Sequence, residues 1–506
     1  GMLKDDRFNK ECYFKDIGRA YYDSYEGAPL GLKEWGAVIQ KRSKIYNFTD
    51  CEKWYEIFDN ESNIKTTCKT IAWYAKKDNP EAYNEWHSEW CKEKLLDALR
   101  MTDDSVAKAF YRIFWLEYIY DEKGWYRFEV KSLYRMKKDI PVRDVIVNKF
   151  KECFESLKNA LMVEKLKQAT ENKARNSGLI LKDIELKIQA CDKLIGKLET
   201  NAFENKVIEA AKKYFYFEDL KDILNKRPEL FATKNMIIEL TSTGAEIRSG
   251  KPEDFITRCA GVKYRFEYNW KHKDVIFALN YLRQVFPDKD LNHFMKKDGA
   301  SYLFRQNREK VVRILIGDTN GSKSIYQKAL RTMLGKYYCD IPPEFYSAKQ
   351  KGSGPNPELA QAEGTSLAFS AEADDDQSFK GSRLKKYSGN DSFFARNCNE
   401  DGGSIETTFK NIFVLNCVPN IEGLDEATKL RIFLIPFRGR WVKKGEALFK
   451  EVPEDFEEQV KMRLYPMNSK FDTPENMNRL ACALLWIFVQ YYPIYLKEDL
   501  EPPKCV

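Results

Sequence analysis

Apolar residues recur at helical spacing through the first two fifths of the chain. In residues 1–130, Trp, Tyr and Leu fall three or four positions apart in stretches such as GLKEWGAVIQ and EAYNEWHSEW, which predicts several short helices. The stretch DEKGWYRFEV predicts a turn at Gly124 followed by a strand. From about 140 to 226, Leu, Ile and Phe alternate with Lys and Glu at periods of three and four. This predicts long amphipathic helices, interrupted near Ser177.

The pattern then changes to short apolar runs. Residues 231–268 predict short strands and turns, and the stretches VIFALNYLRQVF and DLNHFMKKDG predict helices after them. From about 309 to 440, the runs VVRILI, TSLAFSA, NIFVLNCV and RIFLIPF alternate with helical stretches. That alternation is typical of an α/β layer with a mainly parallel central sheet. The final region predicts helices, and its apolar run 481–495 is expected to be a buried helix because it is too short to span a membrane.

Composition narrows the class of protein. With 43% hydrophobic residues and no run long enough for a membrane helix, the chain is expected to be a soluble globular protein without a membrane partner. Its 12 cysteines stand singly, without a CxxC pair, and only 3 histidines accompany them. A zinc site or a disulfide framework is therefore not expected, and a reducing compartment fits best. The net charge of +7 permits a nucleic-acid partner but equally fits an ordinary solvated surface.

One segment combines the three parts of a phosphate-binding loop. Such a loop needs a strand that stops sharply, backbone N–H groups turned inward, and a helix whose N-terminus points at the anion. The run VVRILI predicts the strand, and a helix is expected to begin near Lys323. The loop between them holds Gly317, Asp318, Thr319, Asn320, Gly321 and Ser322. Lys323 would contact the β and γ phosphates of ATP, and the hydroxyl of Ser324 would complete the shell of a Mg²⁺ ion.

Ser322 departs from the strict G-x-x-x-x-G-K-[ST] pattern, which has glycine at this position. Glycine lets the backbone pass close to phosphate. Serine can do the same if its backbone dihedrals stay negative, and its hydroxyl can add a hydrogen bond. On these residues alone, a simple strand-to-helix turn remains an alternative to a nucleotide-binding loop.

Later positions carry the polar groups that ATP hydrolysis needs. Glu372 is the first acid after the apolar run TSLAFSA, with Asp374 two positions later, and a carboxylate there could hold the metal and polarise water. Asn416 ends the run NIFVLN, where a polar side chain could contact the attacking water or the γ-phosphate. Arg431 opens the run RIFLIPF. Taken singly, acids after a strand are commonly a solvated loop, and Asn at a strand end is commonly a turn residue.

Together these segments resemble a known family. GDTNGSKS, LAFSAEAD, LKKYSGNDSFFAR and FKNIFVLNCVPNIEGLDEATKLRIFLIPF are similar to the successive A, B, B′ and C motifs of superfamily 3 helicases, and they stand in the same order. Residues 231–264 resemble the segment that precedes the ATPase core in primase-helicases of nucleocytoplasmic large DNA viruses, of the poxvirus and asfarvirus kind. The specific resemblance covers about residues 231–442.

The resemblance implies an AAA+ type P-loop ATPase core with a mainly parallel central sheet at residues 297–445. Before it, residues 1–130 would be an aromatic-rich helical connector between primase and helicase, and residues 131–296 a helical collar for oligomerisation with short strands near 231–268. Residues 446–506 would form a small helical module. A primase domain is expected upstream in a longer protein, and relatives usually continue beyond the final EPPKCV.

Carried over position by position, the resemblance also implies roles for single residues. Residues 317–324 would bind ATP. Glu372 would hold Mg²⁺ and polarise water, assisted by Asp374, and Asn416 would be the sensor of the γ-phosphate. Arg431 would be an arginine finger, whose guanidinium stabilises charge on the γ-phosphoryl oxygens of a neighbouring subunit's ATP. Because a neighbour supplies the finger, a closed ring is implied, and the rings of the family are hexamers.

Contact with a single DNA strand is expected in the central channel of that ring. In the family, the B′ segment and the hairpin after it line the channel with basic residues. Lys385, Lys386 and Arg396 are the candidates here, although a solvated helix face is the alternative for each lysine. The expected hairpin tip CNEDGG carries Glu400 and Asp401, a departure from a basic tip that argues against phosphate contact there.

The function expected from the sequence is an ATP-dependent DNA helicase of superfamily 3 in viral DNA replication, located in the host cytoplasm. Two alternatives stay open: a P-loop ATPase that is not a helicase, such as a packaging motor, and a nucleic-acid-binding scaffold with a degenerate nucleotide site. Ser322 favours the scaffold. The presence of Lys323, Glu372, Asn416 and Arg431 argues against it, since a decayed ATPase has no reason to keep all four.

Overall fold

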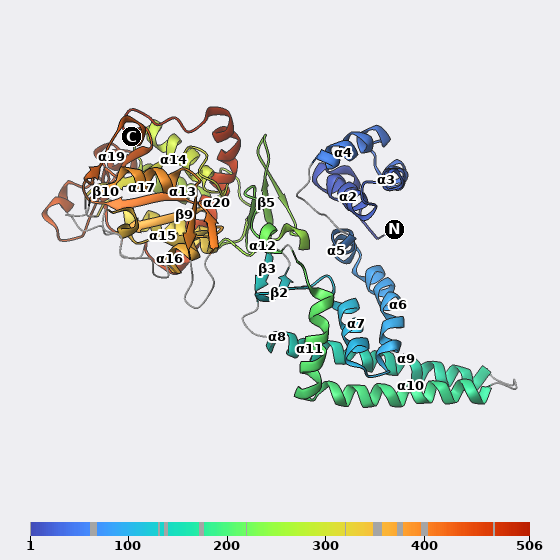
Figure 1. Ribbon diagram of the computed structural model, residues 1–506. Coiled ribbons are helices and arrows are strands. Elements are labelled where there is room, and N and C mark those ends of the chain that lie inside the picture. Colours follow the sequence, from blue (N-terminus) through green and yellow to red (C-terminus); the bar gives the residue numbers. More distant parts are fainter. Residues whose placement is uncertain are drawn as a thin grey trace. The chain divides into compact units, whose positions relative to one another are not determined.

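The computed structural model describes residues 2–60, 68–129, 132–135, 140–171, 177–218, 220–318, 320–347, 357–371, 378–395, 403–468 and 471–506. Contacts between residues divide the chain into two compact units (Figure 1). The first unit comprises residues 1–224 and 251–255, and the second comprises residues 225–250 and 256–506. This division is coarser than the four regions expected from the sequence, which stay a prediction.

The first unit is mainly helical, as the spacing of its apolar residues predicts. Its N-terminal helices are α1 (Asp6–Asn9), α2 (Glu11–Ser24), α3 (Pro29–Arg42), α4 (Phe48–Asn60), α5 (Cys68–Asp78), α6 (Pro80–Ala98) and α7 (Asp103–Phe114). Phe14 of α2 packs against Trp35 and Ile39 of α3 in a small core where all three side chains are fully buried. Many aromatic residues of this region therefore fill cores.

A three-stranded antiparallel sheet follows α7. Its strands are β1 (Tyr118–Asp121), β2 (Gly124–Glu129) and β3 (Ser132–Arg135). The side chain of Asp121 accepts hydrogen bonds from the backbone N–H groups of Lys123 and Gly124, at 2.8 and 3.0 Å, which closes the turn between β1 and β2. The predicted turn at Gly124 and the strand after it are confirmed.

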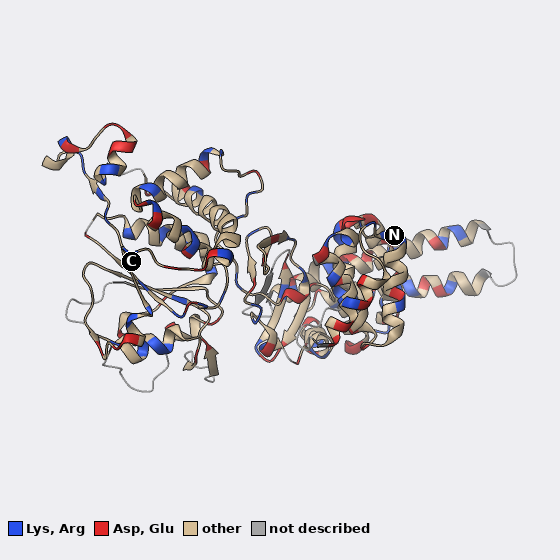
Figure 2. Cartoon of the chain, turned by 90° about the horizontal axis from the view of Figure 1, so that it is seen from above, with Lys and Arg blue, Asp and Glu red and all other residues tan. Residues whose placement is uncertain are grey.

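Two long antiparallel helices, α9 (Lys151–Glu171) and α10 (Ser177–Leu198), form a hairpin that projects from the rest of this unit (Figure 1). Lys and Arg are interspersed with Asp and Glu along both helices (Figure 2), as expected for solvated helix faces. The short helix α8 (Ile140–Val145) leads into them, and α11 (Asn201–Phe215) and α12 (Leu220–Ile223) follow. The helix α11 packs against α7, so the amphipathic helices predicted from 140 to 226 are confirmed.

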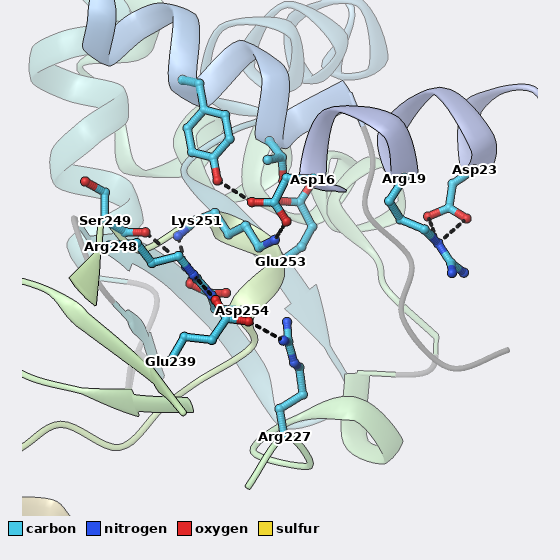
Figure 3. A network of polar contacts seen from close by, with 12 residues as sticks. Asp16, Arg19, Asp23, Arg227, Glu239, Arg248, Ser249, Lys251, Glu253 and Asp254 are labelled. Carbon is cyan, nitrogen blue, oxygen red and sulfur yellow. Dashed lines mark hydrogen bonds and ion pairs between the residues drawn. The ribbon is translucent and has the colours of Figure 1, made fainter. Parts of the chain in front are cut away.

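The segment 251–255 belongs to the first unit, although its sequence neighbours belong to the second. Lys251, which is 3% exposed, forms an ion pair with Asp16 of α2 (Figure 3). The hydroxyl of Tyr74 on α5 donates a hydrogen bond of 2.5 Å to the other carboxylate oxygen of Asp16. A buried and hydrogen-bonded ion pair therefore joins this segment to the N-terminal helices.

The second unit is built on a five-stranded parallel sheet, which confirms the mainly parallel sheet predicted from the alternating apolar runs. The strands lie in the order β15 (Ile432–Pro436), β7 (Val312–Ile316), β13 (Lys410–Leu415), β9 (Leu367–Ala371) and β8 (Tyr338–Asp340). Along β7, Val312 and Ile314 contribute to one core and Leu315 contributes to another. The sheet is therefore buried on both faces, which explains why its strands are continuous apolar runs.

Helices cover both faces of this sheet. One core contains residues of α13 (Lys273–Val285), α14 (Lys289–Ser301), α15 (Lys323–Leu334) and α20 (Pro474–Glu498), and the other contains residues of α16 (Pro357–Gln361) and α17 (Gly381–Ser388). The helix α20 is long and apolar enough to cross a membrane, but 67% of its apolar window is buried inside the protein. It packs on α14 and α15, so the buried helix predicted at 481–495 is confirmed.

Smaller elements surround the core of the second unit. The antiparallel sheet β4 (Leu230–Ala232), β5 (Ile237–Leu240) and β6 (Ala245–Arg248) confirms the short strands predicted after residue 231. The hairpin β11 (Ser392–Ala395) and β12 (Gly403–Glu406) follows α17. The remaining strands and α-helices of this unit are β10 (Phe379–Lys380), β14 (Ile421–Glu422), α18 (Glu426–Lys429), β16 (Arg440–Val442), α19 (Phe456–Met462) and β17 (Leu464–Pro466).

Candidate nucleotide-binding site

The chain turns sharply where β7 ends. A Cβ atom on Gly317 would lie 2.3 Å from the carbonyl oxygen of Phe437, so a larger residue does not fit where β7 and its neighbour β15 end. The helix α15 begins at Lys323, after a loop in which Thr319 lies outside the described residues. The strand, loop and helix predicted around this loop are confirmed. The N-terminus of α15 thus lies at the carboxyl edge of the sheet, the usual place for ligands in such sheets.

Ser322 adopts a backbone conformation that the sequence did not predict. Its φ and ψ are 65° and 12°, in the left-handed region, so the condition stated above, that the dihedrals of the serine stay negative, is not met. The residue keeps the conformation that glycine would adopt readily, which costs a residue with a Cβ atom about 1–2 kcal/mol. Among the described residues, its side chain makes no capping hydrogen bond to α15. Instead, its hydroxyl lies 3.3 Å from the hydroxyl of Tyr281 on α13.

The amino group of Lys323 lies inside the loop. It donates hydrogen bonds to the carbonyl oxygens of Gly317 and Asp318, and to Oδ1 of Asn416 at 3.1 Å. Burial lowers the pKa of Lys323, while the nearby Asp318 acts in the opposite direction. Asn416 directly follows β13, the neighbour of β7 in the sheet. The ends of two adjacent parallel strands therefore bring Lys323 and Asn416 together.

These residues line a cavity of about 980 Å³. Its polar end holds Lys323 and the N-terminus of α15, which attract anions. Its wall also carries aromatic side chains, from Phe277, Tyr281, Trp441, Phe456 and Phe471. The ring of Phe471 lies 5.4 Å from that of Phe277 and 5.6 Å from that of Tyr281, measured between centroids. A cavity with one anion-binding end and one aromatic wall fits the phosphates and the base of a nucleotide.

The expected metal site is only partly described. Ser324 is exposed and lines the cavity, where its hydroxyl is a suitable ligand for Mg²⁺. The strand β9 ends at Ala371, which pairs with Val414 of β13, so the two strands end near the same level. Glu372 and Asp374 lie outside the described residues, and their roles remain predictions.

Arg431 lies at the opposite edge of the sheet from the loop, where the parallel strands β15 and β7 begin. It directly precedes β15, whose first residue, Ile432, pairs with the first residue of β7, Val312. A strand rises about 3.3 Å per residue, so the length of β7, roughly 15 Å, separates Arg431 from the loop. The Nη1 atom of Arg431 donates a hydrogen bond of 3.2 Å to the carbonyl oxygen of Lys385. Within one chain, Arg431 therefore does not meet Lys323 and Asn416.

The two candidate DNA-binding residues that the structure describes lie near that opposite edge. Lys385 and Lys386 belong to α17, where Lys385 pairs with Asp425 at 2.9 Å and Lys386 is exposed. Hydrogen bonds from Thr428, and then from Lys385, lower the pKa of Asp425. Arg396 and the tip of the β11–β12 hairpin lie outside the described residues. Between the two candidates that the structure describes, Lys386 therefore has the more accessible side chain.

The aromatic wall of the cavity was not predictable from the sequence. Tyr281 and Phe277 fall at helical spacing in α13, where apolar periodicity alone indicates core packing. Phe471 comes after the last segment in which a motif was found. These side chains meet only because α13 and the segment after β17 both flank the loop, and no local spacing in the sequence carries that information.

Comparison with known proteins finds curated viral relatives of low sequence identity. No family model matches the chain. "Putative helicase 121R" of Invertebrate iridescent virus 3 is 25% identical over 459 residues, which cover 84% of this chain and 47% of the relative. "Putative helicase 184R" of Invertebrate iridescent virus 6 is 24% identical over 513 residues, or 92% of this chain and 51% of the relative. The chain therefore spans about half the length of these curated relatives.

A relative from another virus also aligns with most of this chain and about half of its own length. "Putative helicase L207/L206" of Acanthamoeba polyphaga mimivirus is 24% identical over 488 residues, which cover 94% of this chain and 48% of the relative. Among solved structures, the apo form of the NrS-1 C-terminal region is 13% identical over 55% of this chain and 60% of that chain, with a TM-score of 0.32 that is too low to define a shared fold. In sequence, the chain is therefore similar to proteins of large DNA viruses that are named as helicases.

Proposed function

We propose that the protein is an ATP-dependent DNA helicase of superfamily 3 with an AAA+ type core, acting in viral DNA replication in the host cytoplasm. The observation that carries this proposal is the meeting of Lys323 and Asn416 beside a glycine-containing loop, in a cavity large enough for a nucleotide. The similarity to viral proteins named as putative helicases supports a nucleic acid as the polymer on which the protein acts.

The geometry suggests how the site would hold ATP. The residues 317–324 would bind the triphosphate, and the aromatic side chains other than Tyr281, whose hydroxyl lies beside Ser322, would contact the base. The protonated amine of Lys323 would exchange its bonds to loop carbonyls for bonds to phosphate oxygens. Asn416, at the end of β13, would orient the water that attacks the γ-phosphate. A Mg²⁺ ion held by Ser324 and Glu372 would neutralise phosphate charge during hydrolysis.

The position of Arg431 favours assembly into a ring. Because Arg431 lies at the far edge of the sheet from its own loop, its guanidinium would serve the ATP of a neighbouring copy. A closed ring, such as a hexamer, places every such arginine beside a loop. One DNA strand would pass through its channel along Lys385, Lys386 and Arg396. A primase domain in a longer protein would supply the neighbouring step of replication.

ATP turnover, with and without single-stranded DNA, tests this proposal. We expect the wild-type protein to hydrolyse ATP faster when single-stranded DNA is added and to unwind a forked duplex. Lys323→Ala should lower turnover by about a hundredfold or more, because the cation that holds the phosphates is lost. Lys289→Ala, an exposed lysine at the start of α14, is the matched control and should leave turnover unchanged.

The alternatives give different results in the same assay. ATP turnover that ignores DNA indicates a P-loop ATPase that is not a helicase. DNA binding without ATP turnover indicates a scaffold. Turnover that persists in Lys323→Ala contradicts the assignment of the loop.

A further inference from the structure

The contact between the hydroxyl groups of Ser322 and Tyr281 has no part in the ATP-binding roles proposed above. We propose that Tyr281 is a positioning residue that holds the phosphate loop in its ATP-binding conformation through the hydroxyl of Ser322. This inference rests on the proposed function of the loop. It concerns a pair of side chains that the motif itself does not contain, because the motif has glycine in place of Ser322.

Ser322 needs a stabilising contact. Its φ of 65° lies in the left-handed region, which a residue with a Cβ atom disfavours. Its peptide link leads directly into Lys323, the first residue of α15. A return of Ser322 to negative φ would therefore turn the N–H group of Lys323 away from the loop and displace the amino group that contacts Gly317 and Asn416. The conformation of this one residue decides whether the anion-binding end of the cavity is formed.

Tyr281 can supply that contact because it is held rigidly. Its side chain is 3% exposed and belongs to the main core of the second unit. Its ring stacks on Phe471 at an interplanar angle of 24°. The two hydroxyl oxygens lie 3.3 Å apart, and either can donate. Burial raises the pKa of Tyr281, so its hydroxyl keeps its proton throughout the neutral range.

The proposal predicts a specific coupling between two positions. With Ser322 present, the Tyr281 hydroxyl offsets the cost of the left-handed backbone. With glycine at position 322, the left-handed conformation carries no steric cost, and the Tyr281 hydroxyl no longer stabilises it. Removal of the Tyr281 hydroxyl should therefore matter in the first background and not in the second.

The test compares KM for ATP, kcat and thermal unfolding in four proteins: wild type, Tyr281→Phe, Ser322→Gly and the double variant. Tyr281→Phe should raise KM about fivefold, the effect of one neutral hydrogen bond, with an unchanged unfolding temperature. Ser322→Gly supplies the background in which the left-handed backbone needs no hydroxyl, and its own KM is the reference for the double variant. The double variant should match Ser322→Gly. Ser322→Ala, which keeps the Cβ atom without the hydroxyl, should raise KM as Tyr281→Phe does.

Tyr326→Phe is the matched control, because Tyr326 is a buried tyrosine of α15 that does not line the cavity. It should leave KM unchanged. An equal rise in KM for Tyr281→Phe in the wild-type and Ser322→Gly backgrounds would overturn the inference, because Tyr281 would then contact the nucleotide directly. An unchanged KM in Tyr281→Phe overturns it too. A wild-type protein that neither binds nor hydrolyses ATP contradicts the proposed function itself, and the inference with it.

Discussion

At the scale of single residues, the centre of the site is the amino group of Lys323. It is surrounded by oxygen atoms, from two loop carbonyls and from the Asn416 side chain, and burial removes part of its hydration. A cation in this position is already desolvated before it meets an anion. Less water then has to be displaced when a phosphate binds, which favours a strong charge-assisted hydrogen bond.

The lowered pKa of Lys323 predicts how ATP binding depends on pH. Burial favours the neutral amine, so Lys323 loses its proton at a lower pH than an exposed lysine, whose pKa is 10.5. Only the protonated amine attracts phosphate strongly. We therefore expect the Kd for ATP to rise with pH in the alkaline range below 10.5. Titration calorimetry at a series of pH values measures this dependence.

The control is Lys323→Arg, which stays charged over the same range and should show a weaker dependence on pH. Equal slopes for the two proteins would show that another group titrates. In that case deprotonation of Lys323 is not the cause of the pH dependence.

The sequence predicted some residues of the site and not others, for a physical reason. Gly317, Lys323 and Asn416 follow strands that are recognisable locally as apolar runs, so their places at the sheet edge could be inferred. The left-handed backbone of Ser322 could not, because it is accompanied by a contact with Tyr281, 41 positions earlier in the chain. Tertiary contacts of this kind leave no local pattern.

At the scale of elements, the parallel sheet was predictable because strands buried on both faces are continuously apolar. The order in which β15, β7, β13, β9 and β8 pair was not, since pairing is decided by tertiary packing. The two-stranded pairs β10–β14 and β16–β17 were missed because strands of two or three residues are too short for any alternation to show.

Close packing of α14 against α20 predicts an unusual effect of an alanine substitution. A Cβ atom on Gly299 of α14 would lie 2.2 Å from ring atoms of Phe488, which is fully buried in α20. Although alanine favours helices, Gly299→Ala should lower the free energy of unfolding by about 1–3 kcal/mol, because the ring cannot move freely in a packed core. Denaturant unfolding followed by circular dichroism measures the change.

The matched control is Gly196→Ala in α10, where an added Cβ atom would meet nothing within 4 Å. There, only helix propensity changes, and the free energy of unfolding should rise by about 0.5–1 kcal/mol. If both variants are stabilised, the interface between α14 and α20 is looser than described.

At the scale of the whole molecule, the boundary between the units runs differently from any boundary visible in the sequence. The first unit takes residues 251–255 from within a stretch that otherwise belongs to the second unit. No shift of composition marks this segment, because KPEDF resembles an ordinary polar turn. Its place in the first unit depends on contacts with distant residues, among them those of Lys251 with Asp16, 235 positions earlier, and of Glu253 with Thr70.

This contact predicts a large effect of a conservative substitution. Asp16→Asn leaves the charge of Lys251 buried without its partner, and it should lower the free energy of unfolding of the first unit by about 3–5 kcal/mol. The double variant Asp16→Asn/Lys251→Met removes both charges and should lose much less. Urea unfolding monitored by tryptophan fluorescence measures both.

Glu11→Gln is the control on the same helix, because Glu11 pairs with Lys15 in an exposed position. It should cost less than about 0.5 kcal/mol. Equal losses for Glu11→Gln and Asp16→Asn would mean that Lys251 does not depend on Asp16.

Because residues 251–255 belong to the first unit but follow a segment of the second, the first unit can be completed only late in synthesis. When residue 224 leaves the ribosome, Asp16 still lacks Lys251, and it gains its partner only after residues 225–250 of the second unit have emerged. The first unit is therefore completed by a piece of chain that arrives late. Until then Asp16, in the N-terminal helices, lacks its cationic partner. A nascent chain that ends at residue 224 therefore releases a first unit without the segment 251–255.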